Sequence, residues 1–452
     1  MAHTLIFDIG KTNKKAFLFD KNYQEVIKVY SRFEEQQDED GFPCDDLPAI
    51  QKWIINTVQN ILQEGKYKVI AINFSTYGAS FVHLDKNGKV LTPLYNYLKP
   101  IPAEIITSFY EKYGDEMKIA RETASPVLDG LLNSGLQLYW LKYSQPKVFE
   151  QIRWSLHFPQ YLSYLLTGIP VSEYTSIGCH TMLWDFKKSD YHRWVYEEGI
   201  DQILPPIVDT STSINCRLWG ESIKIGVGIH DSSAALLPYI RAEQKPFILI
   251  STGTWSISLN AFNQALLTDQ ELENDCLNFM RMDGLPVKAA RLFLGQEYKV
   301  QAKELEAFFN TKKEAHQGVR FDELLYQKVS NDEGHYFSFQ YLKTPWKHPA
   351  VSQLTSFESF EAAYHQLMWE LVTLQVAAAN LAIGQTVVKK LYIDGGFADN
   401  EVFAQLLARY FKDLKLRTTQ SPLGSALGAV MVISEKELHK KFLKKNYALK
   451  KI

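Results

Sequence analysis

The spacing of apolar and polar residues predicts strands that alternate with helices along most of the chain. The runs LIFDI and KAFLF flank a polar turn at residues 10–13, which predicts a hairpin over residues 4–20. Apolar residues at helical spacing predict a helix over residues 47–62, and the apolar run KVIAINF behind it predicts a buried strand that ends at Ser75. The chain therefore begins as an α/β unit.

The second half of the chain repeats this arrangement. The run IKIGVGI predicts a strand that leads into His230 and Asp231, and the helix-like SSAALL follows. FILISTGTWSISLN predicts a hairpin with a polar turn at residues 251–254. A helix over 357–383, the strand KKLYIDGG and a helix over 402–411 come next. This repetition indicates an internal duplication with two α/β lobes, which we place at residues 1–241 and 242–452.

Three other segments carry structural signals. Asn87 and Gly88 separate the apolar runs FVHLD and VLTPLY, which predicts a further hairpin in the first lobe. Residues 100–194 are rich in aromatic residues and mostly helical in pattern, so we expect an insertion carried by the first lobe. The segment from residue 435 onward mixes lysines with apolar residues, which is typical of a solvated amphipathic helix; the alternative is a surface for an anionic partner.

Length and composition limit the class of protein. A chain of 452 residues exceeds what one hydrophobic core usually supports, and 46% hydrophobic residues exclude a disordered chain. A net charge of -2 gives the protein no overall positive potential that would attract polyanions, so no nucleic-acid partner is expected. No apolar run approaches the roughly 20 residues that span a bilayer, and the first residues lack a signal-peptide pattern. We therefore expect a cytoplasmic protein without a membrane partner, and its four widely spaced cysteines predict free thiols.

Two polar turns have the chemistry to hold phosphate groups. The first, DIGKTNK at residues 8–14, places a carboxylate at a strand end beside a turn with backbone N–H groups, lysines and a threonine. It is not a Walker A loop, because Leu5 stands where that motif requires its first glycine. The second, STGT at residues 251–254, offers hydroxyls and amides in a small-residue turn. Either turn alone could equally be an ordinary strand connection.

Two further positions follow predicted strands. Asp231 is expected at the carboxyl edge of a sheet, where open α/β folds bind ligands, although it could simply cap the helix behind it. Gly395 and Gly396 leave room for a flat nucleoside, or they make a tight connection. The order of phosphate turn, strand-end acid, second phosphate turn and glycine pair is more specific than any one of these features.

In this order the features resemble those of the FGGY carbohydrate kinases, members of the actin-like ATPase superfamily, over nearly the whole chain. The family's two phosphate motifs look like residues 8–12 and 251–254, and its adenosine motif looks like residues 393–396 with QLLA behind it. The segment LYWLK at 138–142 is similar to a first-lobe signature, although Gln137 stands where lysine is usual. The resemblance implies two ribonuclease-H-like lobes with mixed sheets flanked by helices, and ATP and sugar in the cleft between them.

The resemblance also implies roles for individual residues. Asp231 would be the catalytic base that accepts the proton of a sugar hydroxyl, and Asp8 would help to hold Mg²⁺. The implied substrate contacts are Tyr77, Gly78, His230, Asp231 and Asn278. The implied ATP contacts are Gly10, Lys11, Thr12, Asn13, Lys14, Thr252, Gly253, Thr254, Gly395 and Gly396.

Two loops bear on the choice of sugar. STYGASF at 75–81 looks like the Thr-Trp-Gly loop of rhamnulokinases, with Tyr77 in place of tryptophan, whereas CLN at 276–278 and RLFLG at 291–295 look more like fuculose-kinase relatives. The expected reaction is transfer of the γ-phosphoryl group of ATP to a hydroxyl of a ketose, with L-rhamnulose or L-fuculose as examples of a deoxy-ketohexose substrate. The alternatives are a xylulokinase-like pentulose kinase, an actin- or chaperone-like ATPase, and a sugar sensor. Monomer and homodimer both remain open.

Overall fold

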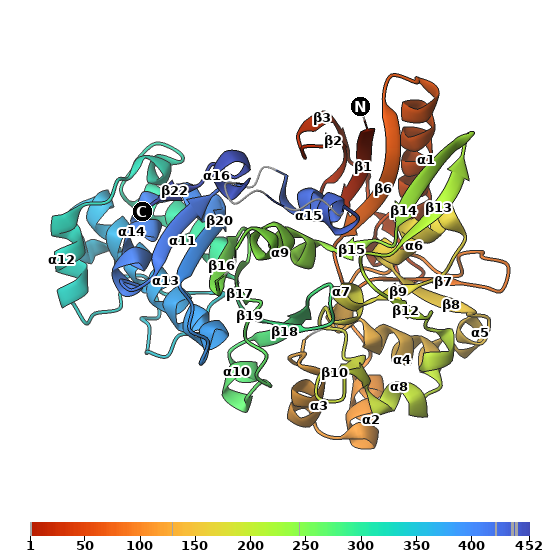
Figure 1. Cartoon of the computed structure of the whole chain (residues 1–452). Helices are drawn as coiled ribbons and strands as arrows, with labels where there is room; N and C mark the ends of the chain where they lie inside the picture. The colour runs from red at the N-terminus through yellow and green to blue at the C-terminus, as the bar shows by residue number, and fades with distance from the viewer. Residues whose placement is uncertain (1, 129, 244, 421–422, 435–437, 439–441) are drawn as a thin grey trace.

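The computed structural model describes every residue except 1, 129, 244, 421–422, 435–437 and 439–441. In the described residues, two seven-stranded mixed sheets form the centres of two lobes (Figure 1). The first sheet contains β1(Ala2–Ile9), β2(Lys14–Asp20), β3(Glu25–Ser31), β6(Lys68–Thr76), β13(Ser213–Leu218), β14(Glu221–Gly226) and β15(Ile229–His230). The second contains β16(Phe247–Thr252), β17(Ser256–Asn260), β18(Cys276–Met280), β19(Pro286–Leu292), β20(Lys390–Gly395), β21(Lys415–Thr419) and β22(Lys450–Lys451).

The two sheets share one strand pattern, which confirms the predicted duplication. In the first lobe the order β3-β2-β1-β6 combines two antiparallel pairs with a parallel pair of β1 and β6. In the second lobe β19-β17-β16-β20 repeats the same directions. The predicted hairpins are thus β1–β2 and β16–β17, and their polar turns lie at equivalent places in the two sheets.

The alternation of side chains along β1 separates two hydrophobic cores. Leu5, Phe7 and Ile9 point to one face, where they pack with buried residues of α1(Leu47–Gln63). Ile6 points to the other face and belongs to a core that joins both lobes. α1 begins at Asp46, whose side chain caps the amide of Ala49, so a cap and an apolar stripe together define the helix predicted here.

Two helices cross between the lobes. α9(Asp231–Ala242) follows β15 and packs against α15(Gly424–Val432), which lies near the end of the chain (Figure 1). α15 also contacts β1 and β6 of the first sheet. Their shared core contains residues from both halves of the sequence, such as Ile6, Leu236 and Leu249. This exchange of helices connects the two sheets at the base of the space between them.

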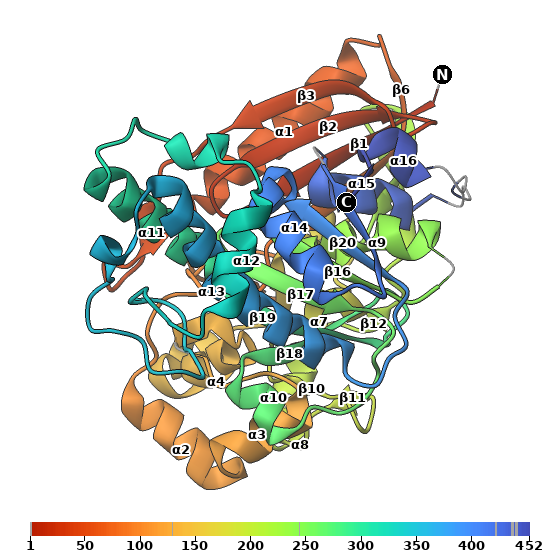
Figure 2. The same ribbon diagram turned by 90° about the vertical axis from the view of Figure 1, so that its left-hand side faces the viewer.

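Residues 100–194 are mostly helical as predicted, with α2(Ala103–Tyr113), α3(Glu116–Thr123), α4(Gly135–Ser144), α5(Pro146–Phe149), α6(Phe158–Thr167), α7(Tyr174–Ile177) and, at their end, α8(Arg193–Glu197). The second lobe carries α10(Asp269–Glu273), α11(Leu294–Phe308), α12(Glu323–Asn331), α13(Phe360–Ile383) and α14(Glu401–Tyr410). Of these helices, α6 packs on the first sheet and α13 on the second, whereas α2, α3 and α4 lie together below the sheets (Figure 2). In the described residues α13 alone is long and apolar enough to cross a membrane, yet 61% of that window is buried inside the second lobe.

The predicted hairpin around Asn87 is wrong as a strand pair. The turn itself forms, because Asp85 accepts backbone N–H groups from Asn87 and Lys89. Beyond it only one bridge, from Leu84 to Val90, joins the two arms. β7(Phe81–Leu84) instead pairs with β8(Trp154–His157), a mostly buried strand that supplies a partner for every residue of β7. The second predicted arm contains Pro93, which has no N–H to donate to a ladder.

Short elements complete the chain. The small strands are β4(Gln36–Gln37), β5(Pro43–Cys44), β9(Ser172–Glu173), β10(Trp184–Asp185), β11(Asp190–Tyr191) and β12(Ile207–Val208). Much of the predicted helix from residue 435 lies outside the described residues, and the part that is described contains α16(Phe442–Asn446). All four cysteines are free thiols, as expected.

Candidate active site

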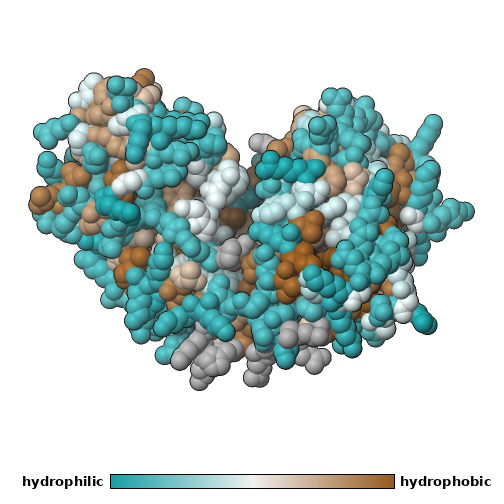
Figure 3. All heavy atoms as spheres, turned by 90° about the horizontal axis from the view of Figure 1, so that it is seen from above, coloured by the Kyte–Doolittle hydropathy of each residue, from teal (hydrophilic) through white to brown (hydrophobic). Residues whose placement is uncertain are grey.

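A large cavity of about 1030 Å³ lies between the lobes and is lined by residues from both. Seen from above, the surface is hollowed between the two halves of the molecule (Figure 3). From the first lobe, Tyr77, Gly78 and His230 line the cavity. From the second lobe, Thr254 and Trp255 face them across it. The structure therefore brings the predicted sugar loop, the strand-end histidine and the second phosphate turn to one space.

A smaller cavity of about 200 Å³ lies beside the large one and shares Ser232 and Ile257 with it. Its polar lining consists of Asp231, Ser232, Ser251, Asp394 and Ser425. Asp231 is the first residue of α9, and 35% of its side chain is exposed. Asp231 therefore lines the small cavity, while its chain neighbours His230 and Ser232 line the large one.

Burial controls the protonation of Asp231 and His230 in opposite ways. It raises the pKa of the Asp231 carboxyl to about 6, although the backbone and hydroxyl of Ser232 act against the rise. It lowers the pKa of the His230 imidazole to about 3, so this ring is neutral at physiological pH. The Nε2 atom of His230 lies 3.2 Å from Oδ1 of Asp231 and 3.1 Å from Sγ of Cys179. A neutral ring thus orients a carboxylate whose pKa lies near the working pH.

Gly78 leaves the space in which this pair is arranged. A Cβ atom at residue 78 would lie 2.7 Å from Sγ of Cys179 and 3.2 Å from the ring of His230. Contacts below 3.0 Å force a neighbour to move, and both neighbours are buried. A side chain at this position would therefore force Cys179 to move and would press on His230, the partner of Asp231.

Asp8 lies at the end of β1, close to the small cavity. Its Oδ1 accepts a hydrogen bond from the Ser425 hydroxyl of α15. Burial raises the pKa of Asp8 to about 6; the Ser425 hydroxyl and Lys15 lower it, whereas the charge of Asp231 raises it further. Asp8 and Asp231 thus lie near enough for the charge of one to raise the pKa of the other, and among the described residues no lysine or arginine forms an ion pair with either of them.

The Asp8 carboxylate has the chemistry to contribute to a divalent-cation site. Carboxylate oxygens are preferred ligands of Mg²⁺, which usually takes one or two of them and completes its shell with water and substrate phosphates. The described residues contain no group of three or more His, Cys, Asp or Glu side chains that could hold a metal by themselves. Asp8 could therefore hold Mg²⁺ only together with a nucleotide and water rather than as part of a closed protein site.

The first phosphate turn is stabilised by the chain itself. The Gly10 amide donates to the carbonyl of Asn13 at 2.9 Å, which closes the turn between β1 and β2. The Lys11 ammonium contacts Asp45 at 2.8 Å and Glu35 at 3.0 Å. Thr12 at the tip is exposed. The tip is thus open to a ligand, and a phosphate would compete for Lys11 with the half-exposed Glu35.

Lys14 lies away from this open tip. Its side chain is 2% exposed, and its ammonium pairs with Asp45 at 2.7 Å. In the hairpin register Lys14 faces Ile9, whereas Lys15 faces Asp8. Because neighbouring strand residues point to opposite faces, Lys15 shares the face of Asp8 and Lys14 does not. The Lys14 side chain is therefore turned inward beneath the turn, where it also donates to the carbonyl of Lys11 at 2.8 Å, and Lys15 lies on the face of Asp8.

The second phosphate turn packs closely against the backbone of Gly395. The Thr252 hydroxyl donates to the carbonyl of Asp394 and accepts the amide of Phe397, so it is already engaged. Gly395 has φ of +88°, and a Cβ atom there would lie 1.9 Å from the carbonyl of Thr252. Gly253 and Gly396 are exposed, and a Cβ atom at Gly396 would meet nothing within 4 Å. The turn thus presents backbone groups, and the glycine pair joins it to β20 with open space in front.

The other two predicted sugar contacts differ in exposure. The Tyr77 ring lines the large cavity, but its hydroxyl donates to Asp45 at 2.7 Å. Asn278 is 2% exposed, and its Oδ1 atom has no hydrogen-bond partner among the described residues. Its neighbour Phe279 lines the cavity instead. Asn278 lies just behind the cavity wall.

Sequence reasoning missed three residues that the structure places at this site. Asp45 joins Lys11, Lys14 and Tyr77, and Lys15 and Ser425 both act on Asp8. A register argument could have found Lys15, because the tight turn makes it the partner of Asp8 in the hairpin. No local pattern marks Asp45 or Ser425.

Comparisons with known proteins agree with this architecture. The N-terminal domain model of the FGGY family of carbohydrate kinases matches residues 3–237, and the model of the carbohydrate kinase FGGY C-terminal domain matches residues 244–441. A carbohydrate kinase from Novosphingobium aromaticivorans superposes with a TM-score of 0.79 at 24% identity, covering 99% of this chain and 93% of that one. A xylulose kinase from Lactobacillus acidophilus gives 0.74 at 16%, covering 100% and 93%. The predicted fold class is confirmed.

Sequence relatives include rhamnulokinases. That of Oceanobacillus iheyensis is 26% identical over 264 residues, which is 56% of this chain and 55% of the relative. That of Mannheimia succiniciproducens is 25% identical over 261 residues, which is 55% and 52%. The chain thus spans about half the length of the curated relatives it matches. Because the two domain models together match nearly all of its residues, the chain belongs to the FGGY family of carbohydrate kinases.

Proposed function

We propose that this protein transfers the γ-phosphoryl group of ATP to a hydroxyl of a ketose sugar. The observation that carries the proposal is the place of Asp231 in the wall of the small cavity, next to His230 and Ser232 of the large cavity, with a pKa of about 6. The large cavity would take the sugar, and the small cavity, with the hydroxyls of Ser251 and Ser425 as donors, would take phosphate oxygens. Asp231 would then face the sugar hydroxyl and the phosphorus atom that it attacks.

The proposed base acts by removing a proton at the moment of attack. The Asp231 carboxylate accepts the hydroxyl proton while the sugar oxygen bonds to phosphorus and the bond to the ADP oxygen breaks. A carboxylate with a pKa of about 6 is a stronger base than an ordinary aspartate and still ionised at pH 7. The neutral ring of His230, which packs next to Gly78 and contacts Sγ of Cys179, keeps the Asp231 carboxylate oriented.

The two turns would hold the phosphates of ATP from opposite lobes. The amides at residues 11–13 and the Lys11 ammonium would bind from the first lobe, and the amide and hydroxyl of Thr254 from the second, because the Gly10 and Gly253 amides already donate within their turns. Mg²⁺ bound by Asp8 would neutralise charge on the phosphates. Lys15, on the face of Asp8, adds positive charge there, whereas Lys14 shapes the turn through Asp45. The nucleoside would lie along the glycine pair at 395–396.

A deoxy-ketohexose is the proposed substrate. Much of the large cavity away from His230 is apolar, as a deoxy sugar with a methyl group requires. The apolar lining includes Leu98, Met117, Val127, Leu128, Leu132, Leu272 and Phe279. The matched rhamnulokinases act, by their names, on a sugar of this class. A pentulose is the second candidate, because a xylulose kinase shares the fold.

A screen of ADP release tests the proposal. We expect release that depends on one of L-rhamnulose, L-fuculose, D- or L-xylulose, D-ribulose or glycerol, with the two deoxy sugars preferred. Asp231→Asn should lower kcat at least about 100-fold, the usual contribution of a positioned base, and should still bind MgADP.

The outcomes separate the alternatives. ATP hydrolysis of equal rate with and without every sugar would favour an actin- or chaperone-like ATPase. Sugar binding without ADP release would favour a sensor. Near-normal turnover by Asp231→Asn would refute the role of this carboxylate. Cytoplasmic location and the oligomeric state stay predictions.

A further inference from the structure

We propose that residues 36–45, here called the strap, couple the first phosphate turn to the sugar side of the large cavity, with Asp45 as the positioning residue. The strap contains β4 and β5 and lies between β3 and α1. It lines neither cavity. This inference rests on the proposed function, because it concerns how the two substrate sides communicate.

Asp45 forms one end of the strap and joins two parts of the site. Its Oδ1 atom accepts the Lys14 ammonium at 2.7 Å. Its Oδ2 atom accepts both the Lys11 ammonium at 2.8 Å and the Tyr77 hydroxyl at 2.7 Å. Two donors from the phosphate turn and one from the sugar loop therefore share one carboxylate. Its side chain is only 5% exposed, so water cannot easily replace a lost donor.

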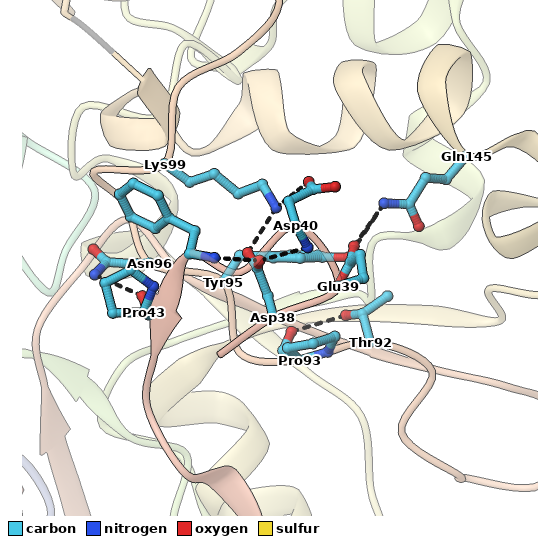
Figure 4. A network of polar contacts seen from close by, with 11 residues as sticks. Asp38, Glu39, Asp40, Pro43, Thr92, Pro93, Tyr95, Asn96, Lys99 and Gln145 are labelled. Carbon is cyan, nitrogen blue, oxygen red and sulfur yellow. Dashed lines mark hydrogen bonds and ion pairs between the residues drawn. The ribbon is translucent and has the colours of Figure 1, made fainter. Parts of the chain in front are cut away.

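The other contacts of the strap fix the neighbouring loop that forms part of the wall of the large cavity (Figure 4). Lys99 donates to Asp38 and to Asp40, each at 2.6 Å, and the side chain of Asp38 is fully buried. Asn96 donates to the carbonyl of Pro43 at 3.0 Å. These contacts anchor the loop at 95–99, whose Tyr97 and Leu98 line the large cavity.

Three further contacts complete this anchoring. The Tyr95 hydroxyl donates to Glu39, and Gln145 of the helical insertion donates to the same carboxylate at 2.7 Å (Figure 4). Asp45 itself forms a backbone bridge with Leu94. The strap thus touches the phosphate turn at one end and the sugar-side loop along its length.

The shared carboxylate makes the two sides depend on each other. If a phosphate draws Lys11 away, Oδ2 of Asp45 keeps only Tyr77 as a donor and the bond to that hydroxyl tightens. If a sugar shifts Tyr77, Asp45 holds Lys11 more strongly. Any effect of one ligand on the affinity for the other must be reciprocal. The Tyr77 ring also packs on Tyr97, 6.1 Å between ring centroids, so the movement reaches the anchored loop.

Tyr77→Phe is the sharpest test, because it removes one hydroxyl and keeps the ring. Without this donor, Asp45 binds Lys11 more strongly, and a phosphate competes less well for the lysine. Calorimetric titration should show a Kd for MgADP raised about fivefold or more, the lower end of the coupling usual between two sites. The changed residue lies in the sugar loop, so a purely local role would leave nucleotide binding unaltered.

Tyr113→Phe is the matched control. Tyr113 is likewise fully buried, and its hydroxyl donates to the carboxylate of Glu198, which also binds Lys112 and Lys142. This cluster has the same chemistry but belongs to the helical insertion and lines neither cavity. The control should lose thermal stability and keep the wild-type Kd for MgADP within about twofold.

A wild-type Kd for MgADP in Tyr77→Phe would overturn the proposal, as would an equal loss of affinity in both variants. Because the titration needs no sugar turnover, it tests the coupling through the strap even if no sugar in the screen is phosphorylated. Where a sugar substrate is found, its KM in Tyr77→Phe should depend less on nucleotide concentration than in the wild type.

Discussion

The pH dependence of catalysis follows from the raised pKa of Asp231. A base must be ionised to accept a proton, so kcat/KM for the sugar should fall as pH drops below about 6. With a pKa of about 6, about a tenth of the carboxyl is ionised at pH 5. With the usual value of 3.8, more than nine tenths would be ionised at the same pH. Relative to pH 7.5, we therefore expect about a tenfold loss rather than a loss of a few per cent.

The assay measures initial rates of ADP release at saturating MgATP from pH 5 to pH 8. His230 adds no ionisation in this range, because the pKa of its ring is about 3. Asp8 titrates near the same pH, since burial raises its pKa to about 6 as well. The variant Asp8→Asn separates the two groups: its acid limb should persist, whereas its Mg²⁺ requirement should rise.

Unfolding is excluded by returning samples from pH 5 to pH 7.5 and recovering full activity. A flat profile between pH 7 and pH 5 would refute the reasoning, because it would mean that the carboxylate is solvated like an ordinary aspartate. Loss of the acid limb in Asp8→Asn would assign the titration to Asp8 instead.

Three further predictions test packing and buried charge. Gly78→Ala should lower kcat/KM for the sugar at least about tenfold, because the new Cβ atom would push Cys179 and press on His230. Adding Cys179→Ala removes the nearer clash at 2.7 Å and should restore part of the lost activity. No loss in Gly78→Ala would count against the tight fit. Gly395→Ala should raise the KM for ATP and lower the Tm, since its φ is positive and its Cβ would lie 1.9 Å from a carbonyl; wild-type values of both would contradict this. Glu370→Gln should stabilise the protein at pH 8 by on the order of 2 kcal/mol in urea unfolding. Burial raises the pKa of Glu370 from 4.5 to about 7, so the folded state binds more protons than the unfolded state in this range and stability falls as pH rises; an unchanged pH slope in Glu370→Gln would show that this carboxyl is not the cause.

Local patterns were sufficient for the elements that carry the site. The hairpin around residues 10–13, the strand before His230 and the strand before the glycine pair appear close to where periodicity and turn residues predict them. The alternation of strands and helices indicated an α/β protein, and the order of these motifs supported the resemblance to the FGGY kinases, which implied the two-lobed fold class. The predicted strand pair around Asn87 was wrong, because a turn signal does not determine which strand pairs with the arm before the turn; β7 pairs with β8.

The sequence by itself determined that Asp8 lies at a strand end and that Asp231 and the two polar turns follow strands, since strand and turn preferences act between near neighbours. Only the tertiary structure decided which distant groups face one another. Asp45 meets Tyr77 across 32 positions, and Ser425 meets Asp8 across 417. Such contacts depend on how separate elements pack, and no local pattern records that packing.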